Sequence, residues 1–549
     1  MQRLSVLLAL ILLISCKEEP LVLPLPTINI ESPSNLEVVK DTTDFREFKV
    51  LDSRYLSKVE LWNEFNDDLE DFTQETHDKL KPLILEQDIP TIQAHIANGD
   101  LNYELLTKFY LFRIREFDRE NELSLNSVIS LNPYVIEEAK TADKTRFVTP
   151  PHELFGMPIL LKDNVNAINM PTTAGAVALY NNYAEDAFIT TQIKKHGGLI
   201  LGKANLSEWA YYFCGVCPSG YSAIGGQTLN PYGRRTIDTG GSSSGSGVSV
   251  SANFCVAAVG SETSGSILSP SSANSIVGLK PTIGLLSRSG IVPISSTLDT
   301  PGPMTKNVID NAILLEAMSG HDPYDTKSSI VKDRDPIRYS EIKKEALVGK
   351  RFGMFKRLTR DSSYVRAIEK LKELGAEIIE VEELEVDRSG FLSLLNLDMR
   401  KDLPVYLSKA ADTAVTVTSV ADVITFNDND SINRAPYGQR LFDGIVNDKG
   451  TDQYLDSIKT AMKSGSRAYF DTPYNEHGLD GFISINNWHA GFAALAEYPA
   501  LTVPMGYTEN GVPRGLTFIA KPLQEQLLLE WGYHYEQATK KRIAPSNYN

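Results

Sequence analysis

GGSSSGSGVSVSANFCVAAVGSETSGS, residues 240–266, contains two clusters of Ser and Gly separated by a run of small and apolar residues. Gly tolerates backbone angles that other residues avoid, and Ser hydrogen-bonds to nearby backbone, so each cluster suits a tight turn. The run between them favours a helix or strand that packs closely against both turns. A flexible linker would lack such an apolar run. The stretch therefore predicts two turns held together by a buried element, and it indicates serine-based acyl chemistry.

On both sides of this stretch, short apolar runs alternate with Gly-rich turns. We expect buried core segments at residues 159–161, 199–201, 252–259, 348–354, 377–381, 482–485 and 501–504, and a helix at 363–374. Strands that alternate with helices predict an α/β fold.

Three other regions show mainly helical patterns. Residues 89–117 carry apolar side chains at helical spacing, broken by Asn98-Gly99-Asp100, which predicts two helices joined by a turn. Residues 523–539 predict a final amphipathic helix. The more polar residues 385–475 are interpreted as a variable helical cap beside the active site. We therefore divide the chain into residues 1–16, a tether and N-terminal extension at 17–86, and one domain at 87–545 that includes the cap.

The first 16 residues, MQRLSVLLALILLISC, have one basic residue and an apolar core that ends at Ser15-Cys16. The apolar run is too short to span a bilayer and is typical of a cleaved export signal. The last four residues resemble the lipobox of bacterial lipoproteins, in which the cysteine is lipidated. The expectation is an exported lipoprotein of the bacterial cell envelope, anchored at Cys16 by lipid only. An ordinary signal peptide or a buried N-terminal helix is the alternative.

Composition limits the partners and cofactors. The net charge of −16 argues against nucleic acid, because binding to a polyanion depends on clustered Lys and Arg. Cys214 and Cys217 have the spacing of a redox motif, but a local disulfide or two unpaired thiols explains them as well. No paired metal-ligand spacing occurs among the His and Cys residues. We expect no metal and no cofactor.

Two interpretations of the Gly/Ser stretch come from widespread motifs. A phosphate-binding loop needs a Lys after the glycines, and none follows. An α/β-hydrolase elbow is formally satisfied by residues 241–245, with Ser243 as the nucleophile of an esterase. That elbow should follow a buried strand, yet residues 232–239 are polar and turn-like. It would also need a downstream Asp and one of the later histidines.

A third interpretation is a resemblance to the amidase signature family. GGSS at 240–243, GSETSGS at 260–266 and GLKPT at 278–282 follow the family's signature in order. Upstream, PILLKDN at 158–164 resembles the segment that carries the family's lysine. Other matching segments are GKANLSE at 202–208, QTLNP at 227–231, DTPGPM at 299–304 and YPALTVP at 498–504. The resemblance covers about residues 87–538.

This resemblance implies a Ser–cis-Ser–Lys triad. Ser266 would be the nucleophile, Ser242 the bridging serine and Lys162 the base, with a cis peptide bond between Gly241 and Ser242. A lysine base must be uncharged, and burial favours that form. Leu160 and Leu161 should provide apolar cover, whereas Asp163 would oppose the effect if it lay close. The family fold is a mixed, twisted sheet flanked by helices, with a helical cap.

The second Ser/Gly cluster is expected to stabilise the oxyanion of the reaction. The backbone N–H groups of the turn formed by Thr263, Ser264, Gly265 and Ser266 would bind it, and Glu262 would accept hydrogen bonds below the turn. The predicted function is therefore hydrolysis of a small-molecule or peptide amide through an acyl-enzyme. A non-catalytic binding lipoprotein is a further alternative.

Some residues depart from the commoner family pattern. Ile267-Leu268-Ser269-Pro270 replaces the usual Ile-Arg-x-Pro, and position 264 is Ser where many members have Gly or Asp. Neither change removes a member of the triad. The KDN sequence at 162–164, the serine-rich run and the Trp at 209 resemble the peptide amidase branch most. The sequence leaves the identity of the amide open.

Overall fold

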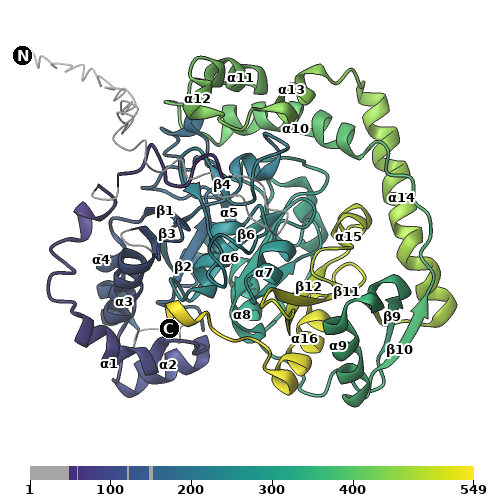
Figure 1. Ribbon diagram of the computed structural model, residues 1–549, viewed down its shortest axis with the longest axis horizontal. Coiled ribbons are helices and arrows are strands. Elements are labelled where there is room, and N and C mark those ends of the chain that lie inside the picture. Colours follow the sequence, from purple (N-terminus) through teal and green to yellow (C-terminus); the bar gives the residue numbers. More distant parts are fainter. Residues whose placement is uncertain (1–47, 58–59, 120–122, 147–151) are drawn as a thin grey trace, which may run out of the picture.

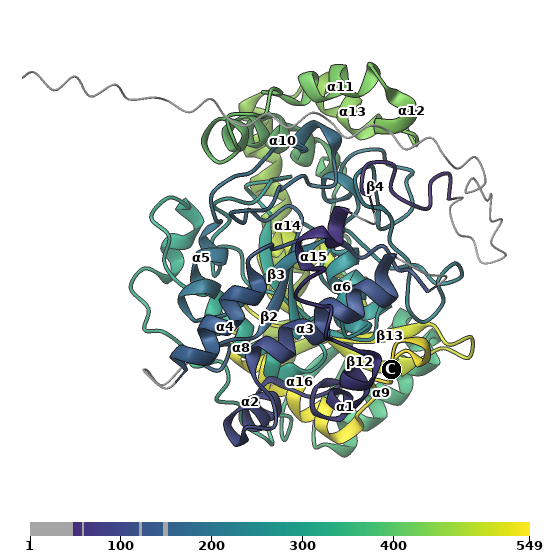
Figure 2. The ribbon, with the colours of Figure 1, turned by 90° about the vertical axis from the view of Figure 1, so that its left-hand side faces the viewer.

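The structure is a computed structural model that describes residues 48–57, 60–119, 123–146 and 152–549. The signal-like segment 1–16, its Cys16 and residues 17–47 of the expected tether lie outside these residues. A central sheet runs through the molecule and is flanked by helices (Figure 1). The view turned by 90° shows the helices of the N-terminal half stacked beside the same sheet (Figure 2).

The sheet has eleven strands in the order β1-β3-β2-β6-β8-β7-β12-β13-β11-β9-β10. Parallel and antiparallel neighbours are mixed: β2 pairs parallel with β3 and β6, whereas β6 and β8 are antiparallel. The strands are β1 (Val128–Leu131), β2 (Pro158–Lys162), β3 (Leu199–Ala204), β6 (Ala257–Glu262), β7 (Val277–Lys280), β8 (Thr300–Thr305), β9 (Arg351–Phe355), β10 (Glu377–Val381), β11 (Gly481–Ile485), β12 (Ala500–Tyr507) and β13 (Pro513–Ile519). A separate ribbon joins β4 (Tyr221–Ser222) to β5 (Gly226–Gln227).

Helices precede, follow and connect these strands. The α-helices outside residues 391–477 are α1 (Gln74–Ile84), α2 (Ile89–Asn98), α3 (Tyr103–Ile114), α4 (Val135–Thr145), α5 (Phe188–Lys195), α6 (Ser244–Ser251), α7 (Leu268–Ala273), α8 (Val308–Met318), α9 (Ser362–Glu373), α15 (Ala490–Ala496) and α16 (Glu525–Thr539). Five more lie together in the chain: α10 (Phe391–Lys409), α11 (Val420–Asp428), α12 (Ser431–Arg434), α13 (Arg440–Asn447) and α14 (Asp452–His477). This last group forms the helical region across the top and right of Figure 1.

The predicted α/β class and the mixed sheet flanked by helices are confirmed. Residues 377–381 form β10, and residues 159–161 lie inside β2. The two expected N-terminal helices are α2 and α3, separated by Gly99 in the left-handed conformation with φ of 84°. Residues 252–259 are all buried, as expected of a core segment, and they contain a loop after α6, which ends at Ser251, and the start of β6 at Ala257. Small residues are compatible with either element, so the pattern did not mark the boundary.

The strands that carry the Ser/Gly stretch are buried on both faces. Every residue of β2 and of β6 is buried, which fits the almost continuous apolar sequence of β2 and the small residues of β6. Helix α6 is also fully buried and packs against β2, β3 and β6. The two serine-rich turns therefore lie at the ends of rigid, tightly packed elements. The domain boundaries given above stay a prediction.

Candidate active site

Lys162 is the last residue of β2, and its side chain is fully buried. Its Nζ lies 2.8 Å from Ser242 Oγ, 2.9 Å from Ser261 Oγ and 3.0 Å from the Ser261 carbonyl oxygen. These three oxygen atoms satisfy the amino group without placing a carboxylate in direct contact with it. The amine is therefore held close to one predicted catalytic hydroxyl in a site without solvent access.

Burial lowers the pKa of Lys162 to about 7, and the negative charges of Asp299 and Glu262 oppose that shift. A nearby charge on Asp163 would also oppose the lowering of the Lys162 pKa, but Asp163 is not among the groups that shift that pKa. Successive side chains of a strand point to opposite faces. Asp163 accordingly pairs with Lys203, with 3.2 Å between Nζ and Oδ1. Its place next to Lys162 in the sequence therefore does not bring the two charges together.

Ser242 lies in the first Ser/Gly turn, just before α6. The peptide bond between Gly241 and Ser242 is cis, as the resemblance implied. The Ser242 side chain is fully buried, and its carbonyl oxygen accepts a hydrogen bond from the Ser207 amide at 3.0 Å. Hydrogen bonds thus hold both the backbone of Ser242, through Ser207, and its hydroxyl, through Lys162.

Ser266 lies in the second turn, between β6 and α7, and is partly exposed. Its carbonyl oxygen accepts the Ser243 amide at 3.1 Å, which joins the two turns directly. Within the described residues the Ser266 hydroxyl makes no hydrogen bond. The arrangement places a free hydroxyl at the surface of a site whose interior contains the hydroxyl of Ser242 and the amine of Lys162.

The backbone amides of the second turn are left without acceptors in the described part of the chain, although the turn itself is well supported. Glu262 Oε2 accepts the amides of Ile267 at 2.8 Å and Leu268 at 3.0 Å, so it supports the turn from below as expected. In the part of the chain that the structure describes, no hydrogen bond is donated by the amides of Thr263, Ser264, Gly265 or Ser266. Four free amides beside an exposed hydroxyl are suited to binding an oxyanion.

Two residues of the site carried no assigned role in the sequence, although both fall in the matching segments. Ser261 accepts Lys162 at its hydroxyl and also accepts Asn164 Nδ2 at 2.9 Å. Asp299 accepts the Thr263 hydroxyl at 2.5 Å with Oδ1 and the Ile294 and Ser295 amides with Oδ2. Asp299 is remote in sequence from Thr263, so only the paired strands β6 and β8 reveal the contact.

The hypothesis of an elbow at Ser243 has no structural support. The buried hydroxyl of Ser243 donates to the Ser261 carbonyl at 3.1 Å and accepts the Ser261 amide at 3.2 Å, which ties α6 to β6. No strand leads directly into it, because residues 228–243 form a loop. Ser243 is therefore a structural link between the two turns.

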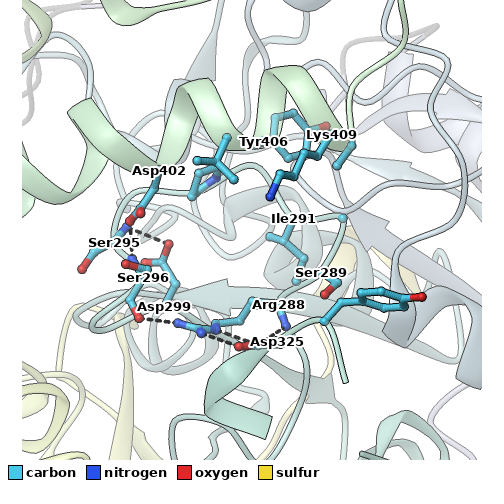
Figure 3. A pocket seen from close by; sticks show the side chains of 15 residues that line it. Arg288, Ser289, Ile291, Ser295, Ser296, Asp299, Asp325, Asp402, Tyr406 and Lys409 are labelled. Carbon is cyan, nitrogen blue, oxygen red and sulfur yellow. Dashed lines mark hydrogen bonds and ion pairs between the residues drawn. The ribbon is translucent and has the colours of Figure 1, made fainter. Parts of the chain in front are cut away.

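A cavity of about 460 Å³ lies beside this site, between residues 288–299 and α10 (Figure 3). Asp299 contributes to its lining, whereas Lys162, Ser242 and Ser266 do not.

Cys214 and Cys217 form a disulfide. Of the explanations that the sequence left open for this pair, the structure therefore selects the local disulfide. Among the described residues, no group of three or more His, Cys, Asp or Glu side chains is placed to hold a metal ion.

Comparisons with known proteins agree along most of the chain. The family model named Amidase matches residues 106–432. A probable amidase of Arabidopsis thaliana is 34% identical over 478 residues, which covers 84% of this chain and 92% of that protein. An amidase family protein of Bacillus anthracis has a crystal structure with a TM-score of 0.86 and 36% identity, covering 90% of this chain and 99% of that one. The native peptide amidase of Stenotrophomonas maltophilia follows with a TM-score of 0.79, 35% identity, and coverage of 84% and 98%.

These comparisons contradict the predicted localisation. Relatives that match more than four fifths of the chain include the plant protein and a glutamyl-tRNA(Gln) amidotransferase subunit of Caldanaerobacter subterraneus, which is 28% identical over 81% of this chain. The prediction of an exported envelope lipoprotein rested on one short apolar run and a cysteine. That signal is far less specific than a match to relatives along four fifths of the chain, and the prediction is wrong. Cys16 lies outside the described residues, and no helix within them is both long and apolar enough to cross a membrane.

Proposed function

The chain belongs to the amidase family and hydrolyses amide C–N bonds, and from this premise we propose that it does so with Ser266, Ser242 and Lys162. The observation that carries this proposal is the short contact between a fully buried amine and the hydroxyl of Ser242. Neither the esterase elbow nor a binding protein without catalysis has support from the geometry or from the relatives.

Lys162 is the base of the proposed reaction. With a pKa lowered to about 7 by burial, a large fraction of the amine is neutral near neutral pH and can accept a proton. An exposed lysine would be almost entirely charged at that pH. The buried setting at the end of β2 therefore makes a residue that is usually a cation into a usable base.

Ser242 carries the proton between the nucleophile and the base. A hydroxyl donates and accepts at the same time, so Ser242 can give its proton to Lys162 while it takes the proton of Ser266. The new bond forms between Ser266 Oγ and the amide carbon. The C–N bond then breaks, and the proton returns along the same path to the departing nitrogen, which leaves as ammonia or an amine.

The free amides of the second turn would receive the negative charge that develops on the carbonyl oxygen. Loss of a single donor of this kind typically costs about a hundred- to a thousandfold in rate. Water then attacks the acyl-enzyme, giving its proton through Ser242 to Lys162. The carboxylic acid leaves and Ser266 regains its proton, so no cofactor is consumed.

The proposed substrate is a carboxylic amide of a small molecule or the C-terminal amide of a peptide. Similarity to the peptide amidase of S. maltophilia at 35% identity supports the second class. The partial exposure of Ser266, next to fully buried partners, agrees with attack on a group presented from the surface. Peptide C-terminal amides are therefore the first compounds to examine.

The test is a panel of peptide amides, aryl amides and acyl-amino compounds, read by release of ammonia or amine. We expect turnover of at least one class by the unmodified protein, and a loss of at least about a thousandfold in Ser266→Ala and Lys162→Ala. Ser243→Ala is the matched control, because Ser243 is the neighbour of Ser242 but its hydroxyl bonds to Ser261 of β6 and not to Lys162. Loss of activity only in Ser243→Ala would support the elbow instead.

Covalent labelling examines the nucleophile without a known substrate. A fluorophosphonate should modify Ser266, and mass spectrometry of the digested protein should find the added mass on the peptide that contains it. Labelling of Ser243 in place of Ser266, or retention of full labelling in Ser266→Ala, would contradict the assigned role.

A further inference from the structure

The cavity of about 460 Å³ beside the catalytic site has a wall that the proposed reaction does not use. One side is the loop 288–299, and the other is the face of α10 that carries Asp402, Val405, Tyr406 and Lys409 (Figure 3). These four residues occupy positions i, i+3, i+4 and i+7 of α10, so one face of the helix lines the cavity. The wall is thus part of a regular element rather than a chance gap between loops.

Exposed apolar side chains converge on this cavity. Val405 is 51% exposed and Tyr324 is 91% exposed, and both line it together with Ile291 and Pro293. Single exposed apolar residues are ordinary, but several around one hollow provide the apolar surface that ligand pockets use. A ligand seated here would remove Val405 and Tyr324 from water, whereas Ile291 is already buried.

The charged groups of the cavity fall into a paired set and an unpaired set. Arg288 binds Asp325 through two nitrogens, at 2.9 and 2.5 Å, so these charges compensate each other. Asp402 accepts the Ser296 amide at 2.6 Å but makes no ion pair within the described residues. Lys409 likewise makes none there, and Figure 3 shows its amine turned toward the cavity.

Asp402 and Lys409 are seven residues apart, or two turns of α10, which separates them by roughly 10 Å along the helix. An extended chain of three residues spans about the same length. We propose that this cavity binds a short peptide with both ends free, its ammonium at Asp402, its carboxylate at Lys409 and an apolar side chain against Val405. The negative charge of Asp402 complements the ammonium of such a peptide, and the positive charge of Lys409 complements its carboxylate. These two charges are the reason for choosing a peptide with free ends.

This site goes beyond the proposed hydrolysis, because none of its lining residues is Lys162, Ser242 or Ser266. The shared residue is Asp299, which lines the cavity and binds the Thr263 hydroxyl of the second turn. A peptide amide lacks the terminal carboxylate, so the cavity should prefer the free acid. Binding can be measured on the full chain with Ser266→Ala, independently of turnover.

The experiment is calorimetric titration of Ser266→Ala with glycyl-leucyl-glycine, its C-terminal amide and its N-acetyl form. We expect saturable binding of the free tripeptide, and binding of the amide and the acetylated form weaker by about two- to fivefold each, as for partly exposed ion pairs. Absence of saturable binding by the free tripeptide at millimolar concentrations would overturn the proposal.

Two lysine substitutions locate the carboxylate. Lys409→Met should remove the preference for acid over amide, because it removes the charge and keeps the length of the side chain. Lys401→Met is the matched control on the same helix: Lys401 is exposed, pairs with Asp452 and lies outside the cavity. If the preference survives in Lys409→Met, or disappears equally in both variants, the carboxylate is bound elsewhere and the assignment is wrong.

Discussion

Lys162 is buried near two carboxyl groups whose effects on its pKa oppose that of burial. Burial is the larger effect and lowers the pKa to about 7, while Asp299 and Glu262 favour the charged form. Asp299 is itself half-buried, and desolvation raises its pKa to about 6. The working range of the base therefore depends on the balance of burial against these two carboxyl groups, and a conservative substitution of Asp299 can change that balance.

We expect the catalytic rate to rise with pH through about 7, because Lys162 must lose its proton to act as the base. Asp299→Asn removes a charge that favours the protonated amine, so the midpoint of this rise should move to lower pH. The measurement is the pH dependence of kcat/KM on the best amide of the panel. A midpoint that stays in place or moves to higher pH would show that Asp299 does not act on Lys162.

Thr263→Val separates the charge of Asp299 from its hydrogen bond. This variant removes the hydroxyl that donates to Asp299 and keeps the carboxylate. We expect kcat to fall by about tenfold, in the range for loss of a hydrogen bond to a charged group. The same hydrogen bond lowers the pKa of Asp299, so its loss should reduce the charge of Asp299 and move the midpoint to lower pH, by less than Asp299→Asn does. A midpoint that moves equally far in both variants would mean that the charge and the hydrogen bond act as one effect.

At the scale of the elements, the second turn depends on a conformation that glycine provides. Gly265 has φ of +94°, and a Cβ on it would lie 2.8 Å from Asn487 Nδ2. The strain of this conformation for other residues is about 1–2 kcal/mol. The added contact would displace either the Asn487 side chain or the turn whose amides we assign to the oxyanion. The sequence of the turn is therefore fixed by both backbone and packing.

Gly265→Ala should lower kcat by about tenfold or more, while the protein stays folded. Gly349→Ala is the matched control, because Gly349 has φ of +72° but nothing within 4 Å of its added Cβ. The two variants carry similar backbone strain and should have similar melting temperatures. Equal loss of activity in both would attribute the effect to global stability and not to the turn.

The elements that the sequence predicted well have strong local signals. Strand β2 combines a continuous apolar run with a following polar turn, and α2 and α3 are separated by a left-handed Gly99. The order of the strands was not predictable in this way, since β8 lies between β6 and β7 although it follows both in sequence. The contact of Thr263 with Asp299 depends on that order, which is why no role for Asp299 emerged from the sequence.

At the scale of the whole molecule, the active site is supported by segments from both ends of the chain. Arg113 of α3 donates to the carbonyl oxygens of Asn253 at 2.9 Å and Ala252 at 3.0 Å, and also to that of Tyr548. Figure 1 shows the C-terminus returning to the N-terminal helices. The loop between α6 and β6, the two elements that carry the serine turns, is thus held by the last residues of the chain. A local sequence pattern cannot reveal a contact across 435 positions.

Tyr548→Ala tests whether the end of the chain stabilises the site. The Tyr548 ring is fully buried and packs against Phe117 and Phe254, with centroids 6.0 and 6.5 Å away. Loss of a buried aromatic ring costs about 3–5 kcal/mol, so the thermal midpoint should fall by several degrees. The exposed neighbour Asn547→Ala should leave it within about a degree, since surface substitutions usually change stability by under about 0.5 kcal/mol. If the two variants melt together, Tyr548 does not anchor the loop behind the serines, and that loop is held by Arg113, α6 and β6 without it.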